Sequence, residues 1–168
     1  MSMSNVLYSA TEIDHKVADC AKFVDAAVTR NNNTVICPIL QSSFYFTSNL
    51  FSKLLTTPQV DFCGVSFYDK DGLEDGLYMY KGPDVTVYDN KHVIIIDVIT
   101  NTGTTLDYVS KFLKQMGAKS VTTACLLYRQ FSKHNPTWKG FTISDELVYG
   151  YGIDHQYKHR TLPYIAYE

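Results

Sequence analysis

The sequence predicts an α/β protein with a mostly parallel central sheet and helices on both of its faces. Segments with helical periodicity alternate with short apolar segments along much of the chain, as in parallel sheets whose strands are joined by helices. The most apolar segment, residues 93–96, is a run of Val and Ile with no polar side. Such a run indicates a strand buried on both faces, which is typical of the middle of a parallel sheet.

The individual elements follow from periodicity and from their end signals. In the first predicted helix, apolar residues from Ile13 to Val28 recur at spacings of three and four, and Thr11 is a plausible N-cap. The predicted helices cover residues 11–30, 43–55 and 104–116, the last closed by Gly117. The predicted strands cover residues 34–40, 60–67, 77–80, 85–88, 93–96 and 120–128. Residues 133–139 form a polar connection, and the Tyr- and Gly-rich residues 141–168 are expected to be irregular apart from short extended pieces.

A small polar turn follows the central strand. Asp97 stands at the carboxyl end of that strand, and Asn101, Thr102, Gly103, Thr104 and Thr105 lead into the third helix. Backbone N–H groups of such a turn and of a helix N-terminus converge on one place, where a phosphate fits. An ordinary strand-to-helix turn with a Thr cap remains the alternative.

Other turns are expected at the same edge of the sheet. Residues 68–76 are mostly charged and carry two Gly, which is common in a lid over a site, although a plain hairpin connection is the alternative. Ligands of open α/β sheets bind beyond the carboxyl ends of the strands. The turns predicted at that edge cover residues 41–43, 68–76, 98–105 and 129–139. We therefore treat them as four parts of one candidate site.

Composition limits the function classes. With 168 residues, 45% of them hydrophobic, the chain is expected to form a single domain, residues 1–168. A net charge of −2 argues against nucleic acid or an anionic membrane as partner, and no apolar run reaches the roughly 20 residues of a membrane span. The 13 Tyr and 9 Phe are many, and some are expected to line a site for a flat ligand.

Cysteine and histidine usage favours a cytoplasmic protein without a structural metal. The four cysteines stand in apolar contexts with no CxxC spacing, as buried reduced thiols do. The N-terminus lacks the basic region and apolar core of a signal peptide. His155 and His159 could be metal ligands on a helix, but a surface role is favoured because no third ligand has a recognisable spacing.

Four segments in collinear order carry a resemblance to a known family. Residues 93–106 resemble the 5-phosphoribosyl-1-pyrophosphate signature of type I phosphoribosyltransferases, and residues 140–165 resemble the C-terminal purine-binding segment of their hypoxanthine-guanine branch. Residues 35–46 resemble the pyrophosphate-loop region, and residues 60–68 resemble the strand before the flexible catalytic loop. The resemblance implies a type I phosphoribosyltransferase fold with a small C-terminal hood over approximately residues 129–168. It also implies association into a homodimer or homotetramer.

The resemblance implies roles for the residues that bind phosphoribosyl pyrophosphate. Asp97 would contact the ribose hydroxyls, directly or through the cofactor Mg²⁺, and Asp145 would help to hold Mg²⁺ near the purine. Tyr68 would belong to the catalytic loop. The 5′-phosphate would be held by Thr102, Gly103, Thr104 and Thr105, and the pyrophosphate by Gln41, Ser42 and Arg160.

The resemblance also implies a purine site. Trp138 would stack on the base, a contact worth about 1–3 kcal/mol, with Lys139 beside it; core packing is the alternative for Trp138. Arg129 replaces a lysine of the family that reads the purine 6-oxo group, and an arginine can donate there in a different geometry.

The chain departs from the family pattern where the chemistry occurs. Val98 replaces the second acid after the central strand, and Asn101 replaces the aspartate that acts as general base near purine N7. An amide cannot accept that proton, although it can form a hydrogen bond. Gln41 and Ser42 replace a cation and a glycine. Val98 also removes a partner for a ribose hydroxyl, which raises the possibility of a deoxyribose ligand.

Two hypotheses follow. The first is a divergent purine phosphoribosyltransferase of purine salvage, which makes a nucleoside monophosphate and pyrophosphate from a purine base and phosphoribosyl pyrophosphate. Its activity would be reduced by Asn101, Val98 and Gln41. The second is a catalytically weakened or inactive protein that senses or sequesters purine nucleotides in the same pocket. The retained phosphate turn and C-terminal segment favour the enzyme.

Overall fold

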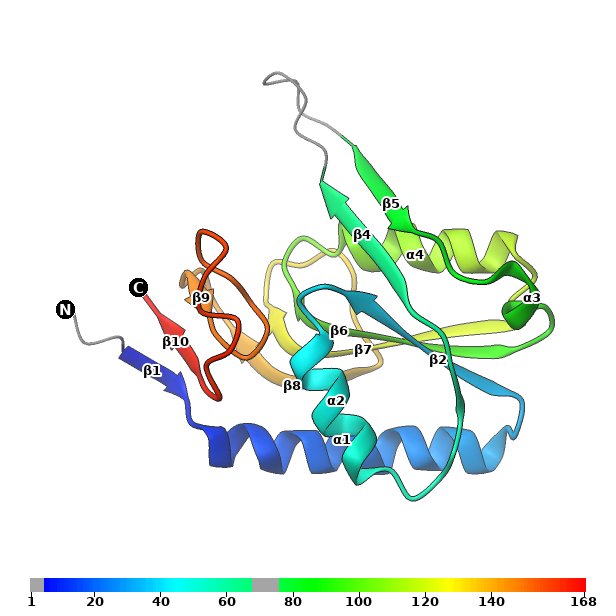
Figure 1. Cartoon of the computed structure of the whole chain (residues 1–168), viewed down its shortest axis with the longest axis horizontal. Coiled ribbons are helices and arrows are strands. Elements are labelled where there is room, and N and C mark those ends of the chain that lie inside the picture. The colour runs from blue at the N-terminus through cyan, green and yellow to red at the C-terminus, as the bar shows by residue number, and fades with distance from the viewer. Residues whose placement is uncertain (1–4, 68–75) are drawn as a thin grey trace.

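The computed structural model of the protein describes residues 5–67 and 76–168. A central sheet carries helices on both faces, as predicted (Figure 1). The helices are α1 (Ala10–Arg30), α2 (Phe44–Lys53), α3 (Val85–Tyr88) and α4 (Thr104–Gln115). The strands are β1 (Asn5–Tyr8), β2 (Thr34–Leu40), β3 (Gln59–Val60), β4 (Cys63–Phe67), β5 (Leu77–Lys81), β6 (His92–Thr100), β7 (Ser120–Arg129), β8 (Trp138–Ile143), β9 (Val148–Tyr149) and β10 (Ile165–Tyr167).

The central sheet is parallel apart from one edge. Within the described residues it has seven strands in the order β5-β4-β2-β6-β7-β8, with β3 beside β2. Only the hairpin of β4 and β5 is antiparallel among these pairs. Val93 of β6 lies opposite Val35 of β2 and Val121 of β7, so the predicted central strand is central. The carboxyl ends of β2, β6 and β7 therefore meet at one edge.

Alternate residues of β6 supply two separate cores. Ile94 and Ile96 pack toward α1 and α2, whereas Val93 and Ile95 pack toward α4 and α3. All four side chains are almost completely buried. Successive strand residues point to opposite faces, so an uninterrupted Val/Ile run is what a strand covered on both sides requires.

A second, three-stranded sheet forms the hood. Its order in the described chain is β1-β10-β9, so the hood contains the N-terminal strand as well as the C-terminal segment (Figure 1). Gly152 connects it to the main sheet: its φ is +99°, and a Cβ there would lie 2.0 Å from the carbonyl oxygen of Ser42. This approach holds the C-terminal segment against the turn after β2.

Several element predictions were wrong in detail. Residues 85–88 form helix α3 and not a strand, because the Asp84 side chain accepts a hydrogen bond from the Thr86 N–H at 2.9 Å and caps a helical turn. The N-cap of α1 is Ser9 in a capping box with Glu12, and not Thr11. The strand predicted over residues 60–67 is divided into β3 and β4, and the polar connection predicted over residues 133–139 already includes the start of β8.

Two expectations about composition can be compared with the structure. The four cysteines are buried and free, as predicted. Among the residues that the structure describes, no helix is long and apolar enough to cross a membrane. The predicted loop at residues 68–76 falls almost entirely outside the described residues.

Candidate active site

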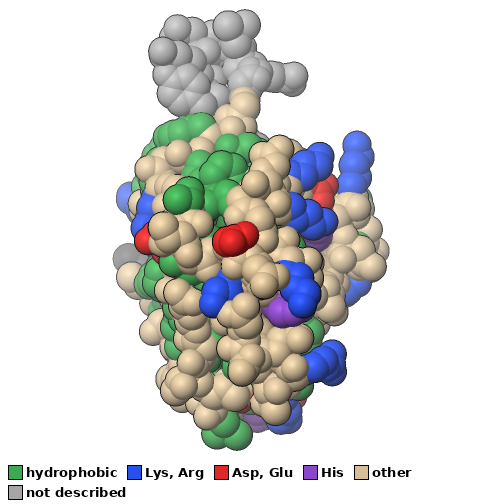
Figure 2. All heavy atoms as spheres, turned by 90° about the vertical axis from the view of Figure 1, so that its right-hand side faces the viewer, with side chains coloured by type: hydrophobic (Ala, Val, Ile, Leu, Met, Phe, Trp, Pro, Cys, Tyr) green, Lys and Arg blue, Asp and Glu red, His purple; other side chains and the backbone are tan. Residues whose placement is uncertain are grey.

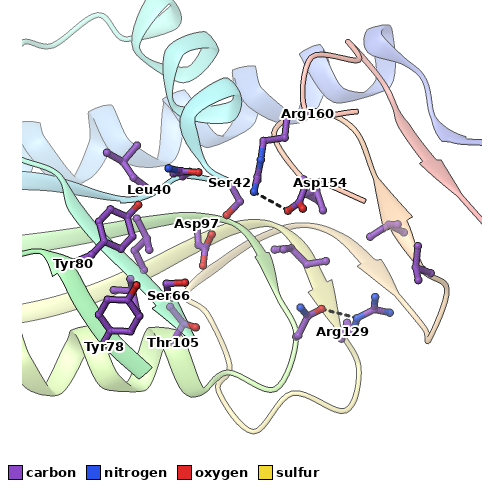
Figure 3. Close-up of a pocket in the computed structure, with 18 residues that line it drawn as sticks. Leu40, Ser42, Ser66, Tyr78, Tyr80, Asp97, Thr105, Arg129, Asp154 and Arg160 are labelled. Carbon is purple, nitrogen blue, oxygen red and sulfur yellow. Dashed lines mark hydrogen bonds and ion pairs between the residues drawn. The ribbon is translucent and has the colours of Figure 1, made fainter. Parts of the chain in front are cut away.

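A cavity of about 690 Å³ lies at the carboxyl edge of the central sheet (Figure 3). The hairpin of β4 and β5 bounds it on one side, and the hood bounds it on the other. Two of the four predicted turns, residues 41–43 and 98–105, supply lining residues, whereas Arg129 is the lining residue from the turn at 129–139. The lining residues are Ile39, Leu40, Gln41, Ser42, Val65, Ser66, Tyr78, Tyr80, Asp97, Ile99, Asn101, Thr105, Arg129, Leu147, Val148, Ile153, Asp154 and Arg160. The position agrees with the edge that the sequence predicts.

The turn after β6 forms a hollow of its own, about 250 Å³, which shares Asp97, Ile99, Asn101 and Thr105 with the larger cavity. Gly103 is the N-cap residue of α4, with φ +91° and no side-chain cap bond. The N–H of Thr104 donates to the Thr102 hydroxyl at a long 3.4 Å, and the next N–H groups of α4 are available to an anion. A Cβ at position 103 would lie 2.4 Å from the Cβ of His134, so a larger residue does not fit.

Arg129 and Asn101 form a fixed pair at the side of the cavity nearest the hood (Figure 3). Arg129 Nε donates to Asn101 Oδ1 at 2.7 Å, Nη1 donates to the Ser144 carbonyl at 2.5 Å, and Nη2 donates to the Glu146 carbonyl at 2.8 Å. Three acceptors in three directions hold the guanidinium in one orientation.

Asp97 is the carboxylate at the base of the cavity. Its residue is only 6% exposed, and its Oδ1 accepts the Val98 N–H at 2.7 Å. Burial raises the pKa of Asp97 to about 7, although hydrogen bonds from the backbone N–H groups of Val98 and Ile99 act in the opposite direction. Within residues 5–67 and 76–168, no Lys or Arg forms an ion pair with this carboxylate.

A second carboxylate, Asp154, lies at the hood side of the cavity and is paired with Arg160. Asp154 Oδ1 is 2.7 Å from Arg160 Nη2, and Arg160 Nη1 donates to the Gly152 carbonyl at 2.7 Å (Figure 3). Both side chains are about a third exposed or less. The ion pair therefore presents one cation and one carboxylate to a ligand at the rim.

Many of the residues singled out from the sequence lie together. The larger cavity contains Gln41, Ser42, Asp97, Asn101, Thr105, Arg129 and Arg160, and the smaller hollow contains Thr102, Gly103 and Thr104. The peptide bond between Leu40 and Gln41, at the start of the turn after β2, is cis. Tyr68 lies outside the described residues.

Three predicted residues do not line the cavity. Trp138 opens β8 opposite Ala124, in the middle of β7. It packs against Phe46 in the core, with 6.4 Å between the ring centroids. Core packing, the alternative reading of Trp138, is what the structure shows. Lys139 is exposed and contacts Asn135 and the ring of Tyr128. Asp145 is exposed between β8 and β9, and Asp154 supplies the carboxylate on that side of the cavity.

Val98, where the chain departs from the family pattern, is a core residue in the structure. The side chain is fully buried in the core between β6, α1 and α2 and does not line the cavity. Val98 therefore leaves no gap where a ribose hydroxyl would lie, and it gives no support to a deoxyribose ligand.

Sequence reasoning missed the apolar walls, and it expected aromatic lining residues without saying which ones. Leu147 is 46% exposed and lines the cavity near Arg129, with Ile99 from β6 as another apolar wall. Tyr78 and Tyr80 project from β5 (Figure 3). The only available signal for Leu147 was an apolar residue directly after two acidic ones, which is too weak to separate a wall from a core position.

The fold and the site together define an α/β protein with a Thr- and Gly-containing turn at the N-terminus of α4, beside a cavity lined by two arginines and two aspartates. The family model of the phosphoribosyl transferase domain matches residues 7–156, and the chain belongs to the phosphoribosyltransferase family. Relatives within that family include hypoxanthine and hypoxanthine-guanine phosphoribosyltransferases.

Two curated relatives and one crystal structure illustrate the similarity. The hypoxanthine phosphoribosyltransferase of Buchnera aphidicola is 31% identical over 96% of this chain and 93% of its own. The hypoxanthine-guanine phosphoribosyltransferase of Streptococcus pneumoniae is 30% identical over 90% of this chain and 87% of its own. The crystal structure of a hypoxanthine-guanine phosphoribosyltransferase from Bacillus anthracis, with HEPES in the active site, superimposes with a TM-score of 0.87 at 27% identity and covers 98% of each chain. Both the predicted family and the predicted fold class are confirmed.

Proposed function

We propose that the protein transfers the 5-phosphoribosyl group of phosphoribosyl pyrophosphate to a 6-oxopurine base, giving a nucleoside monophosphate and pyrophosphate in purine salvage. The observation that carries the proposal is that Asn101 borders both the larger cavity and the phosphate hollow while it holds Arg129. A base beside Arg129 and a phosphate in the turn would therefore lie on either side of Asn101. Nothing in the family comparisons favours the non-catalytic alternative.

The purine lies against the apolar walls. Ile99 and Leu147 supply flat apolar contact for the rings, and hydrogen-bond donors of Arg129 meet the 6-oxo group. Because the guanidinium is fixed by three acceptors, it favours a 6-oxo group over a 6-amino group, which would bring donor against donor. Hypoxanthine and guanine are therefore better substrates than adenine.

Phosphoribosyl pyrophosphate occupies the rest of the site. The 5′-phosphate binds the backbone N–H groups and hydroxyls of residues 102–105, Asp97 meets the ribose hydroxyls, and Arg160 with Gln41 and Ser42 meets the pyrophosphate. In the reaction, N9 of the base attacks C1′ as the bond to pyrophosphate breaks. Positive charge develops on the ribose ring as pyrophosphate departs. Much of the rate acceleration comes from positioning the two reactants and from the fixed charges around them.

The donor set fits Mg²⁺. Asp97 is a buried carboxylate whose pKa is raised by burial, with no cation paired to it among the described residues, and Asp154 adds a second carboxylate at the rim. The described residues contain no cluster of three His, Cys, Asp or Glu that would form an all-protein metal site. Mg²⁺ commonly binds through one or two carboxylates together with substrate phosphates. When bound, it would offset the negative charge of the departing pyrophosphate.

Assembly and location are part of the proposal. We expect a homodimer or homotetramer in the cytoplasm. Figure 2, viewed onto the right-hand side of Figure 1, shows hydrophobic side chains gathered in the upper part of that face. Exposed hydrophobic residues of the described chain include Tyr78 and Tyr80 of β5 and Val85 of α3. Exposed apolar surface of this kind marks interaction sites, and four free, buried cysteines suit a reducing compartment. Light scattering coupled to size-exclusion chromatography tests the assembly.

A direct assay tests the activity. The protein is incubated with phosphoribosyl pyrophosphate, Mg²⁺ and each of hypoxanthine, guanine, xanthine and adenine, and pyrophosphate release is measured. Release with 6-oxopurines and little with adenine is the expected result. If no base gives pyrophosphate while calorimetry shows tight binding of a purine nucleotide, the protein is a nucleotide-binding module and the proposal fails.

A further inference from the structure

The hydrogen bond between Arg129 and Asn101 fixes which end of the Asn101 amide faces a ligand. Arg129 Nε is the donor and Asn101 Oδ1 the acceptor, at 2.7 Å. A guanidinium carries only N–H donors, so the amide can meet it only with its carbonyl oxygen. Within the described chain, the Asn101 side chain has no other partner except Arg129. Its Nδ2 group is therefore a free donor at the border of the two hollows.

Arg129 adds further donors to the same side of the cavity. Nη1 and Nη2 each donate one N–H to a backbone carbonyl, of Ser144 and Glu146 respectively. With Nε bonded to Asn101, three of the five N–H groups of the guanidinium are used and two remain. The Arg129–Asn101 pair thus offers free N–H donors, whereas its one acceptor atom, Asn101 Oδ1, is engaged by Arg129.

The consequence for the base rests on the proposed function. The 6-oxo group and N7 are neighbours on one edge of a purine, so a base whose oxygen meets Arg129 places N7 beside Asn101. The free Nδ2 group of Asn101 accommodates the N7 lone pair and disfavours an N7–H group, which would oppose donor to donor.

Reactivity at N9 adds a second requirement. A neutral base with a free electron pair at N9 carries its proton on N7, where it opposes Asn101, and an amide cannot take up that proton. A neutral base with N7 free carries the proton on N9, which then has no electron pair for attack. Only the anion has free electron pairs at both nitrogens.

We propose that the Asn101–Arg129 pair selects purine bases in their anionic form, so that bases whose imidazole-ring N–H ionises readily are preferred over guanine and hypoxanthine. The base loses its proton to water before the reaction. Its N9 pair forms the bond to C1′, and the pair of the C1′–oxygen bond leaves with pyrophosphate. The other charged groups that line the cavity are Asp97, which accepts the Val98 N–H, and the Asp154–Arg160 ion pair, and none of them is bonded to Asn101.

The test compares guanine with 8-azaguanine, in which an additional ring nitrogen makes the N–H more acidic. The kcat/KM of each base is measured with saturating phosphoribosyl pyrophosphate and Mg²⁺ in the wild-type protein and in Asn101→Asp. The wild type should favour 8-azaguanine by about tenfold or more. Asn101→Asp should reduce that ratio by about tenfold or more, because a carboxylate still accepts from Arg129 and also takes the N7 proton, help that is typically worth 10²–10⁴-fold.

A wild-type measurement keeps the inference falsifiable if the variant folds poorly. The kcat/KM of each base is followed against pH, and the profile for 8-azaguanine should lie at lower pH than the profile for guanine. Equal kcat/KM for the two bases, or superimposable pH profiles, would overturn the inference while leaving the proposed function intact. Absence of pyrophosphate from both bases in both proteins would instead overturn the proposed function, and the inference with it.

Discussion

His134 Nδ1 lies 2.6 Å from Asp107 Oδ1, and this contact ties the loop after β7 to the first turn of α4. The other ring nitrogen, Nε2, lies 2.8 Å from the hydroxyl of Thr123 on β7. The same loop holds the phosphate turn directly, because the Lys133 N–H donates to the Thr102 carbonyl at 3.0 Å. His134 therefore connects β7 to the first turn of α4, beside the turn at residues 102–105 that we propose binds phosphate, and we infer that it is a positioning residue.

Replacing His134 with Ala should weaken phosphoribosyl pyrophosphate binding. The KM for this substrate is expected to rise about three- to tenfold with a smaller change in kcat, since the turn becomes looser while the cavity keeps its groups. The free energy of unfolding should fall by about 1–3 kcal/mol, because two side-chain hydrogen bonds are lost and their partners remain. Steady-state kinetics and urea unfolding measure the two effects.

The exposed His15 on α1 provides the matched control. His15→Ala should change neither quantity noticeably. A kcat that falls while KM stays constant in His134→Ala would contradict the positioning role.

A cation restored at position 41 should improve binding of phosphoribosyl pyrophosphate. Arg129 and Arg160 are the cations among the described residues that line the cavity, whereas Gln41 is neutral and exposed. Gln41→Lys should lower the KM for this substrate about three- to tenfold and make it more sensitive to salt, because an added charge beside a pyrophosphate is worth about 1 kcal/mol when partly exposed. Gln41→Met controls for side-chain length. Identical KM values in the two variants would show that position 41 lies away from the pyrophosphate.

Asp25 is a stability determinant remote from the site. Its carboxylate accepts hydrogen bonds from the N–H groups of Leu55 and Thr56 and from the Thr56 hydroxyl, which holds the chain beyond α2 against α1. Burial acts to raise the pKa of Asp25, but the hydrogen bonds of Thr56 and Leu55 outweigh it and hold the pKa below its ordinary value.

Asp25→Ala should therefore reduce the free energy of unfolding at neutral pH by about 1–2 kcal/mol. Because the folded-state pKa is lowered, the contribution of Asp25 is complete above its ordinary pKa and is lost as the pH falls through the folded value. The difference between wild type and variant should shrink in acid, as measured by urea unfolding across pH. Asp19→Ala, which removes only an exposed pair with Lys22 on the same helix, should cost less than about 0.5 kcal/mol.

The sheet could be predicted because its signal is local. The Val/Ile run at residues 93–96 indicates burial on both faces whatever its neighbours are, and the helices on either side have clear apolar stripes. Residues 85–88 were wrongly predicted to form a strand because Val, Thr, Val and Tyr all favour strands. The Asp84 side chain caps a helical turn there through two hydrogen bonds from Thr86. The strand propensities of residues 85–88 do not take this capping side chain into account.

The site could be predicted only where one continuous segment makes it. Residues 101–105 follow a strand directly, so their place at the sheet edge is fixed by the chain itself. The place of Trp138 depended on where β8 begins and on its parallel pairing with β7, with Trp138 opposite Ala124. Neither the start of β8 nor its register with β7 is encoded in the residues near Trp138. The polar neighbours of Trp138 suggested instead a loop beyond the carboxyl end of β7.

Asp154, and not Asp145, is the carboxylate that lines the cavity on the hood side. The family resemblance pointed to Asp145 as the carboxylate near Mg²⁺, but Asp145 is exposed outside the cavity, and Asp154 lines it in an ion pair with Arg160. Asp154→Asn should lower kcat/KM for phosphoribosyl pyrophosphate by about 10–100-fold, since Arg160 loses its partner and the rim loses a charge available to Mg²⁺. The Mg²⁺ concentration at half-maximal rate should rise in the same variant. Asp145→Asn has the same change of charge and should stay within about twofold of the wild type, so a larger loss in Asp145→Asn than in Asp154→Asn would return the role to Asp145.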